Sequence, residues 1–188
     1  MRLTPARFGA AWNHFFHWQY ECGRPDAVPD RGAVYLIPFA RGVKVQVRGV
    51  GGGEDLHIGE ESHAVDFQVS TGAVITAARG GRVVEIRERS PGPPTEGRGD
   101  SVLVQHDDGT VGQYFSWGLD LKGLAAGKVV QPGDPIARHE NPGRSVGYIV
   151  HFGVFVPQDG IRKSVPLRFA VGDGGPAALR AGQVYSRR

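Results

Sequence analysis

Glycine and proline interrupt this chain at short intervals along its whole length, and their spacing constrains the fold more than any other feature. The 188 residues include 29 glycines and 13 prolines, which are spread along the chain rather than clustered. Such frequent turn-forming residues suit short extended segments better than long helices. The sequence therefore predicts many short strands joined by tight turns, in one domain of ordinary size.

Apolar and polar residues alternate in much of the chain after residue 33, as in half-buried strands. The early segments that read as strands are 34–39, 43–50 and 63–69. Gly80-Gly81 and Asp108-Gly109 each separate two further strand-like segments, which predicts two hairpins. We expect a mainly β fold with an antiparallel sheet or β-sandwich-like core.

The first 32 residues have a different pattern. Aromatic and apolar side chains recur at helical spacing between residues 8 and 20, and Thr4-Pro5 fits a helix cap and first turn. We therefore expect a helical extension over residues 1–32 and the main domain over residues 33–188. The expected role of this N-terminal α-helix is to cover a sheet edge, because exposed edges invite pairing with other chains.

Charge and composition argue against several classes of protein. The net charge is only +3 and the arginines are dispersed, so the sequence does not predict nucleic-acid binding. Cys22 is the single cysteine, which excludes an intrachain disulfide. No apolar stretch approaches the about 20 residues of a transmembrane helix. The first residues lack the features of a signal peptide, so a cytoplasmic location is compatible with this sequence.

Three residues far apart in the sequence form a candidate metal-ligand set. His57, Asp66 and His151 would supply two imidazoles and a carboxylate, and would leave a fourth position for water, as in catalytic zinc sites. His63 is the alternative to His57. It lies three residues before Asp66, and an odd separation places two side chains on opposite faces of a strand. We favour His57, although among seven histidines spacing alone carries little weight.

Several segments, in order, resemble the LytM/lysostaphin-like zinc endopeptidases, which cut peptide cross-links in bacterial peptidoglycan. The segment 63–84 resembles that family's His…Asp-Phe strand and its glycine-containing hairpin, and 101–117 resembles the next hairpin. The segment 129–137 resembles a Val-x-x-Gly-x-x-Ile strand, and 141–154 resembles the segment that ends in His-Leu-His-Phe. The resemblance extends from about residue 35 to residue 185.

This resemblance implies a duplicated-hybrid-motif, lysostaphin-like fold with an open groove. One Zn²⁺ ion would be held by His57 (or His63), Asp66 and His151, and Tyr114, Ser116 and Tyr148 would line the groove. The loops at Gly51–Gly53 and 90–100 would form the walls of the groove. The implied partners are peptidoglycan peptides or a cell-wall hydrolase, and the implied location is the cell envelope, the periplasm or the exterior.

Two residues depart from the family pattern. The segment Tyr114-Phe115-Ser116-Trp117 matches a Tyr-x-His-Leu segment, so Ser116 stands where the family has one catalytic imidazole, and Ile149 stands where it has the other. Loss of an acid–base group typically lowers a rate about 10²–10⁴-fold. We therefore interpret the chain as a degenerate, zinc-binding member with lost or weakened peptidase activity.

Two alternatives stay open. The first is an active endopeptidase in which His63, His139 or Tyr148 substitutes for a missing imidazole. The second is a metal-free interaction or regulatory domain, in which the three ligand-like residues no longer bind an ion.

Overall fold

A computed structural model describes residues 21–51, 57–88, 99–140, 149–172 and 175–187. Several predicted features fall wholly or partly outside these residues. They are the N-terminal helix, the groove walls at Gly52–Gly53 and 90–98, and Tyr148. The division between 1–32 and 33–188 stays a prediction. No helix among the described residues is long and apolar enough to cross a membrane.

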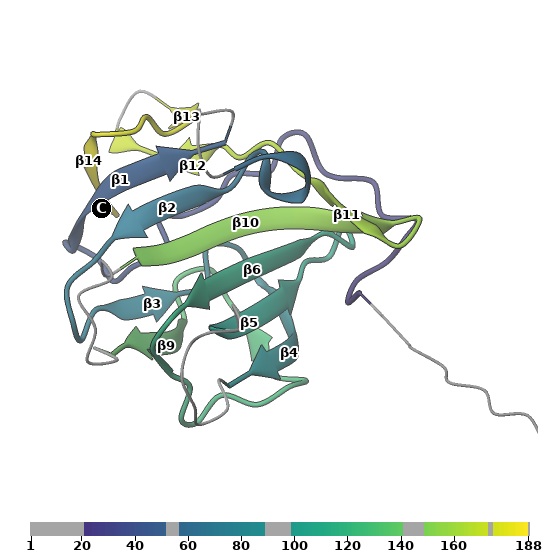
Figure 1. Ribbon diagram of the computed structural model, residues 1–188, viewed down its shortest axis with the longest axis horizontal. Helices are drawn as coiled ribbons and strands as arrows, with labels where there is room; N and C mark the ends of the chain where they lie inside the picture. Colours follow the sequence, from purple (N-terminus) through teal and green to yellow (C-terminus); the bar gives the residue numbers. More distant parts are fainter. Residues whose placement is uncertain (1–20, 52–56, 89–98, 141–148, 173–174, 188) are drawn as a thin grey trace, which may run out of the picture.

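A nine-stranded antiparallel sheet dominates the fold and confirms the predicted mainly β class (Figure 1). Its strands follow the order β14-β1-β2-β10-β6-β5-β4-β8, and β11 pairs with β10 beside this path. The strands are β1 (Lys44–Val50), β2 (Val65–Gln68), β4 (Gly81–Arg87), β5 (Asp100–Gln105), β6 (Val111–Ser116), β8 (Val129–Val130), β10 (Ile149–Gln158), β11 (Ile161–Ser164) and β14 (Val184–Ser186).

Two smaller sheets complete the described part of the chain. The three-stranded sheet has the order β3-β9-β7 and contains β3 (Val74–Thr76), β7 (Leu119–Asp120) and β9 (Pro135–His139). A two-stranded sheet pairs β12 (Phe169–Ala170) with β13 (Pro176–Ala177). The 3₁₀ turn η1 (Gly59–Glu61) precedes β2 and packs against β11.

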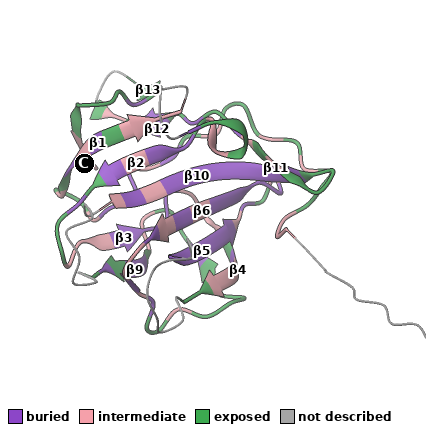
Figure 2. Cartoon of the chain, in the orientation of Figure 1, coloured by how far each residue is buried: buried purple, intermediate pink, exposed green. Residues whose placement is uncertain are grey.

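A buried aromatic cluster joins the large sheet to the segments that cover it. Phe152 of β10 makes a tilted contact with Tyr114 and edge contacts with Tyr35 and Phe169, at ring-centroid distances of 4.9–6.1 Å. Figure 2 shows buried residues along the central strands β2, β10 and β6. Aromatic side chains bury large apolar areas, so this cluster stabilises the packing of the central strands.

The hairpin predicted at Asp108-Gly109 is confirmed. β5 and β6 pair antiparallel from Asp100↔Ser116 to Gln105↔Val111, and Gly109 in the turn has a φ of 84°. A positive φ favours glycine because a Cβ atom is strained there. The predicted position of the turn and the observed turn agree because this signal is local.

The hairpin predicted at Gly80-Gly81 is wrong. β3 pairs with β9 and β4 pairs with β5 and β8, so the chain crosses between two sheets at this point. A Cβ atom on Gly81 would lie only 2.2 Å from the carbonyl oxygen of Gln105. Glycine is required at position 81 because two backbones approach each other closely there, not because the chain makes a tight turn.

The segment 34–39 also differs from its prediction. It forms only isolated bridges, Tyr35↔Phe169 and Phe39↔Ile75, although Tyr35, Ile37 and Phe39 are buried. Burial of alternate side chains produces the strand-like sequence pattern, and the segment makes no continuous ladder with a neighbouring strand.

Candidate metal centre

The two central strands β2 and β10 bring Asp66 and His151 together. The two strands are antiparallel neighbours, and Asp66 and His151 occupy directly opposite positions in the ladder. Opposite residues on neighbouring strands project from the same face of a sheet. The sheet register therefore joins two side chains that are far apart in the sequence.

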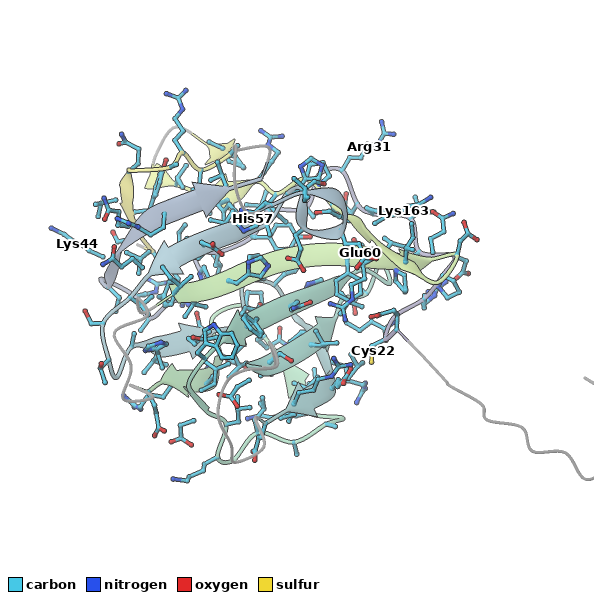
Figure 3. All side chains as sticks on the ribbon, viewed as in Figure 1. Cys22, Arg31, Lys44, His57, Glu60 and Lys163 are labelled. Carbon is cyan, nitrogen blue, oxygen red and sulfur yellow. The ribbon has the colours of Figure 1, made fainter. Side chains whose placement is uncertain are left out.

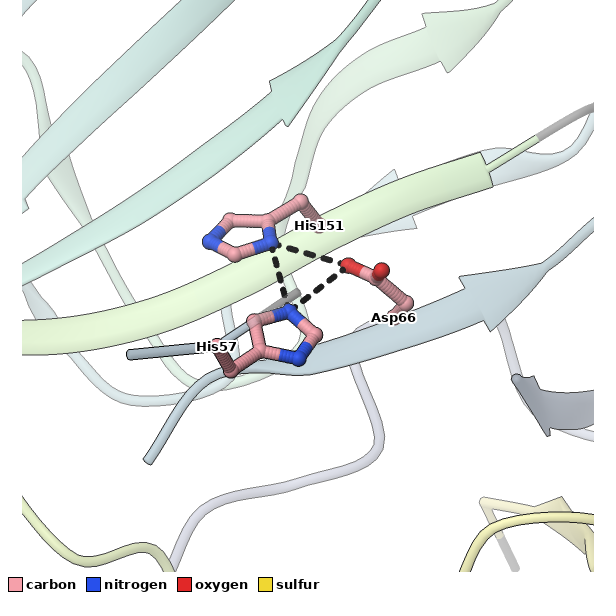
Figure 4. Close-up of side chains that lie close together, drawn as sticks. All are labelled: His57, Asp66 and His151. Carbon is pink, nitrogen blue, oxygen red and sulfur yellow. Dashed lines mark hydrogen bonds and ion pairs between the residues drawn. The ribbon is translucent and has the colours of Figure 1, made fainter. Parts of the chain in front are cut away.

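His57 reaches the same place from the segment before η1. Its ring stacks on that of His151, with a centroid distance of 5.2 Å and an interplanar angle of 22° (Figure 4). Gly49 of β1 leaves the space for this ring, since a Cβ atom there would lie 3.1 Å from Cε1 of His57. Figure 3 shows His57 among the side chains of the sheet, and its side chain is buried.

The three side chains present one donor atom each to a common point. The Nε2 atom of His57 lies 3.3 Å from Oδ1 of Asp66 and 3.4 Å from Nδ1 of His151. Nδ1 of His151 lies 2.8 Å from Oδ1 of Asp66. These are the three residues that group together as potential ligands within the described part of the chain.

These distances fit a tetrahedral zinc site. Donor atoms on bonds of about 2.0–2.1 Å lie roughly 3.3–3.4 Å apart at the edges of a tetrahedron. Two of the three separations have this value, and the shorter one, between His151 and Asp66, is an ordinary hydrogen bond. Two imidazoles and a carboxylate are also donors that zinc accepts, so the residues fit the metal.

Without a metal, the contact between His151 and Asp66 shifts the pKa values of both side chains. Burial alone would lower its pKa, but hydrogen bonds to Asp66 and Glu61 outweigh burial and raise the pKa to about 9. Burial would raise the pKa of Asp66, yet the hydrogen bond with His151 and the neighbouring charges hold it below its usual range. A metal must displace the proton between these two groups, so binding would release a proton at neutral pH.

Glu61 is a member of this group that the sequence did not reveal. It is the last residue of η1, and its Oε2 atom makes an ion pair with Nε2 of His151. Its partner lies far downstream, and no spacing rule connects a residue in a short turn with a strand of another part of the sheet. Only the packing of η1 against β11, the hairpin partner of β10, makes this contact possible.

His63 does not join the cluster. It lies at the turn that precedes β2, and its backbone N–H donates to Oγ of Ser164 at 3.0 Å. The residue is exposed, whereas His57 is buried beside Asp66. Of the two candidates for the first histidine, the structure therefore places His57, and not His63, with Asp66 and His151.

Two residues assigned to the groove are in the core instead. Tyr114 is fully buried, and its hydroxyl accepts a hydrogen bond from the backbone N–H of Ala78 at 2.7 Å. Ser116 is also buried, and its hydroxyl donates to the carbonyl oxygen of Ile149 at 2.7 Å. Neither side chain can line an open groove, because both project from the core face of β6.

Aromatic residues occupy the face of β6 that adjoins the cluster. Phe115 lies opposite His151 in the ladder, and the two rings meet edge to face at 6.5 Å. Trp117 contacts Phe115 at 5.9 Å in the same manner. Ile149 lies on the face of β10 that carries His151, because the two residues are separated by two positions.

His139, a further candidate to replace a missing catalytic imidazole, lies in the three-stranded sheet. His139 is buried at the end of β9, where it pairs with Leu119 of β7. Sequence reasoning did not identify Phe115 as a neighbour of the cluster. The available signal was the alternation of side chains along a strand, which places Phe115 on the opposite face from Tyr114 and Ser116.

A comparison of the sequence with protein families decides the affiliation of the chain. Residues 60–163 match the profile of Peptidase family M23. The chain belongs to peptidase family M23. The matched part of this M23 domain begins in η1 and ends in β11, so it contains Asp66 and His151, whereas His57 precedes it. No curated protein sequence matches the chain.

Solved structures share the fold of this M23 domain. The M23 metalloprotease pseudoalterin, from the deep sea, is 18% identical with a TM-score of 0.51, and the match covers 83% of this chain and 96% of that one. A zinc-containing peptidase from Vibrio cholerae is 20% identical with a TM-score of 0.51, over 72% of this chain and 41% of that one. Csd3 from Helicobacter pylori is 22% identical with a TM-score of 0.50, over 80% of this chain and 36% of that one. The chain thus spans less than half the length of two of these structures.

Proposed function

We propose that this M23 domain binds one Zn²⁺ ion through His57, Asp66 and His151 and acts on the peptides of bacterial peptidoglycan. The observation that carries the proposal is the convergence of three donor atoms at separations suited to tetrahedral zinc. Membership of the family and the resemblance to a zinc-containing peptidase support the same conclusion. A role at peptidoglycan would place the domain in the cell envelope, the periplasm or the exterior.

The chemistry proposed for the site divides between the metal and the chain. Bound zinc would act as a Lewis acid on a peptide carbonyl and would lower the pKa of a bound water towards about 7. The chain holds the donors in place: Asp66 accepts a hydrogen bond from Nδ1 of His151 in the metal-free state, and Gly49 leaves room for His57. The rings of Phe115 and His151 meet edge to face, which places an apolar group beside His151.

We further propose that peptide hydrolysis is lost or weakened. The two positions that the family resemblance assigns to catalytic imidazoles are Ser116 and Ile149, and the hydroxyl of Ser116 is buried and bonded to a backbone carbonyl. Ile149 offers no hydrogen bond to a substrate. Removal of an acid–base group costs about 10²–10⁴-fold in rate. Such a domain would retain peptidoglycan peptides, or a cell-wall hydrolase, as a binding partner.

Metal analysis of the purified protein tests the first part of the proposal. We expect one zinc ion per chain after loading and gel filtration, loss of the ion in Asp66→Asn, and retention in Asp120→Asn. Asp120 is the matched control because its carboxylate lies in β7, where it accepts a hydrogen bond from the backbone of Lys122. A wild-type protein that takes up no zinc would refute the metal site and would favour the metal-free interaction domain.

Digestion of purified peptidoglycan tests the second part. We expect the zinc-loaded wild type to sediment with peptidoglycan and to release peptides slowly or not at all. Fast release that chelation and Asp66→Asn both abolish would instead establish the active endopeptidase. In that case a replacement group acts in the site, and substitution of His63, His139 and Tyr148 in turn would identify it.

A further inference from the structure

The two ring nitrogens of His151 have carboxylate partners on opposite sides. Nδ1 faces Asp66 and His57, where the three donor atoms converge. Nε2 faces Glu61 from η1. The two nitrogens of an imidazole point away from each other, so Glu61 approaches the ring from behind the candidate metal position. Glu61 therefore lies outside the group of potential ligands, in a position to act on the ring of His151.

A carboxylate at Nε2 determines which tautomer of His151 is present when one proton has left the ring. A carboxylate accepts hydrogen bonds and donates none, so the remaining proton stays on Nε2 and the lone pair is on Nδ1. Nδ1 is the atom that faces Asp66 and His57. Partners of this kind orient metal-binding histidines and raise the basicity of the ligand nitrogen.

η1 is held in place by the same hairpin that carries His151. β11 pairs with β10 from Phe155↔Ser164 to Gln158↔Ile161. The backbone N–H of Arg162 donates to a carboxylate oxygen of Glu60 at 3.3 Å, and Oγ of Ser164 accepts from the N–H of His63. η1 is thus fastened to β11 at its middle residue, Glu60, and through His63, two residues beyond its end.

Contacts on several sides hold the side chain of Arg162 in place, and they stabilise β11, against which η1 packs. Its Nε atom donates to Glu21 at 2.7 Å, its Nη1 atom donates to Gln113, and its guanidinium lies 4.5 Å from the ring centroid of Phe155. The side chain is mostly buried. Figure 3 labels Glu60 at the turn beside this part of the sheet.

We propose that Glu61 is a positioning residue that holds His151 in the tautomer and orientation in which Nδ1 binds the metal. The β10–β11 hairpin carries His151 and, through η1, sets the position of Glu61. The inference rests on the proposed zinc site and deepens it, because it assigns a role to a residue that donates no ligand atom. Glu61 acts through His151 and does not touch the reacting atoms.

The test measures zinc affinity directly, by competition between the metal-free protein and a chromogenic chelator. We expect Glu61→Ala to weaken zinc binding about 10–100-fold, the usual cost of losing such a partner. Glu61→Gln should weaken it less, because the amide oxygen of glutamine can still accept a hydrogen bond from Nε2–H. Glu140→Gln is the control, since it removes the same charge from an exposed side chain just after β9, which belongs to a different sheet. We expect its affinity to stay within about threefold of the wild type.

A spectroscopic readout separates positioning from general charge effects. In the zinc-loaded protein, the Nε2–H proton of His151 should be visible by ¹⁵N-edited NMR and protected from solvent, and Glu61→Ala should expose it to fast exchange. Thermal unfolding of the metal-free variants checks that the fold is intact, which we expect because the Glu61 side chain is 39% exposed.

The outcomes distinguish this inference from the proposed function. Zinc binding by the wild type together with unchanged affinity in Glu61→Ala would refute the role of Glu61 alone. An equal loss of affinity in Glu140→Gln would also refute it, because the effect would then come from the loss of a negative charge anywhere in the protein. A wild type that binds no zinc would refute both.

Discussion

At the scale of the residue, the candidate centre depends on Gly49 as well as on its donors. The ring of His57 occupies the space where a side chain at position 49 would lie, and that ring stacks on His151. β1 also has a bulge in its pairing with β2 between Val47 and Gly49. Bulges redirect strands next to functional sites, and this one brings the backbone of β1 close to the metal position.

The choice of the first histidine can be tested with a pair of single substitutions. We expect His57→Ala to weaken zinc binding by at least the 10–100-fold that loss of an indirect partner costs. His63→Ala should leave the affinity near that of the wild type, because His63 is exposed and its hydrogen bond to Ser164 comes from its backbone N–H. Chelator competition measures both. Retained affinity in His57→Ala together with lost affinity in His63→Ala would reverse the assignment.

At the scale of the element, β6 divides its side chains between two environments. Tyr114 and Ser116 project into the core, whereas Phe115 projects towards His151 on the neighbouring strand. β10 carries Ile149 and His151 on the same face as Phe115. The residue of β6 beside the candidate centre is therefore the apolar Phe115, whereas the family resemblance of segment 114–117 assigned Tyr114 and Ser116 to the groove.

This division predicts that histidines introduced at positions 116 and 149, the two positions that depart from the family pattern, change the stability of the fold by unequal amounts. Ser116→His puts a larger ring into a buried, hydrogen-bonded site, so we expect a loss of about 1–3 kcal/mol in unfolding free energy. Ile149→His places its ring on the half-buried face of β10, and we expect it to cost less. Urea unfolding of the metal-free proteins measures both effects.

Ser116→Ala serves as the control for the same position. It removes only the hydrogen bond to Ile149 and should cost about 0.5–1.5 kcal/mol. A Ser116→His protein as stable as the wild type would show that position 116 faces solvent and that the inferred face of β6 is incorrect.

At the scale of the whole molecule, Asp108 links the segment before β1 to the large sheet. Its carboxylate accepts hydrogen bonds from Arg79 at 2.7 Å and from the hydroxyl and backbone N–H of Thr110, and also from the backbone N–H of Asp30. Burial would raise its pKa, but these partners lower it from 3.8 to about 2. The carboxylate thus joins three parts of the chain that are distant in sequence.

The low pKa of Asp108 predicts an acid-dependent loss of stability. A carboxyl group with a lowered folded-state pKa contributes stability that is fully present above its unfolded value, 3.8, and is lost as the pH falls through about 2. We expect Asp108→Asn to be less stable than the wild type at pH 6, and the difference in unfolding free energy to shrink between pH 4 and pH 2. Denaturant unfolding at a series of pH values measures the difference. A difference that stays constant over this range would show that the pairing of Asp108 does not stabilise the fold.

The predictable features of this protein are those with local signals. The hairpin at Asp108-Gly109 follows from turn chemistry, and the face shared by Ile149 and His151 follows from the two-residue period of a strand. Gly80-Gly81 carries the same local signal as a turn, yet there the glycine permits a backbone crossing between sheets. Nearest-neighbour information cannot separate these two uses of glycine.

The sequence by itself determined a mainly β fold, the family resemblance and a short set of candidate ligands, because periodicity and motif order are encoded along the chain. The tertiary structure decided which ligands meet, since only the register of β2 against β10 and the space above Gly49 bring His57 to Asp66 and His151. It also decided that Tyr114 and Ser116 face the core and that Glu61 reaches His151. Contacts of this kind depend on which strands are neighbours, a long-range property that no single segment specifies.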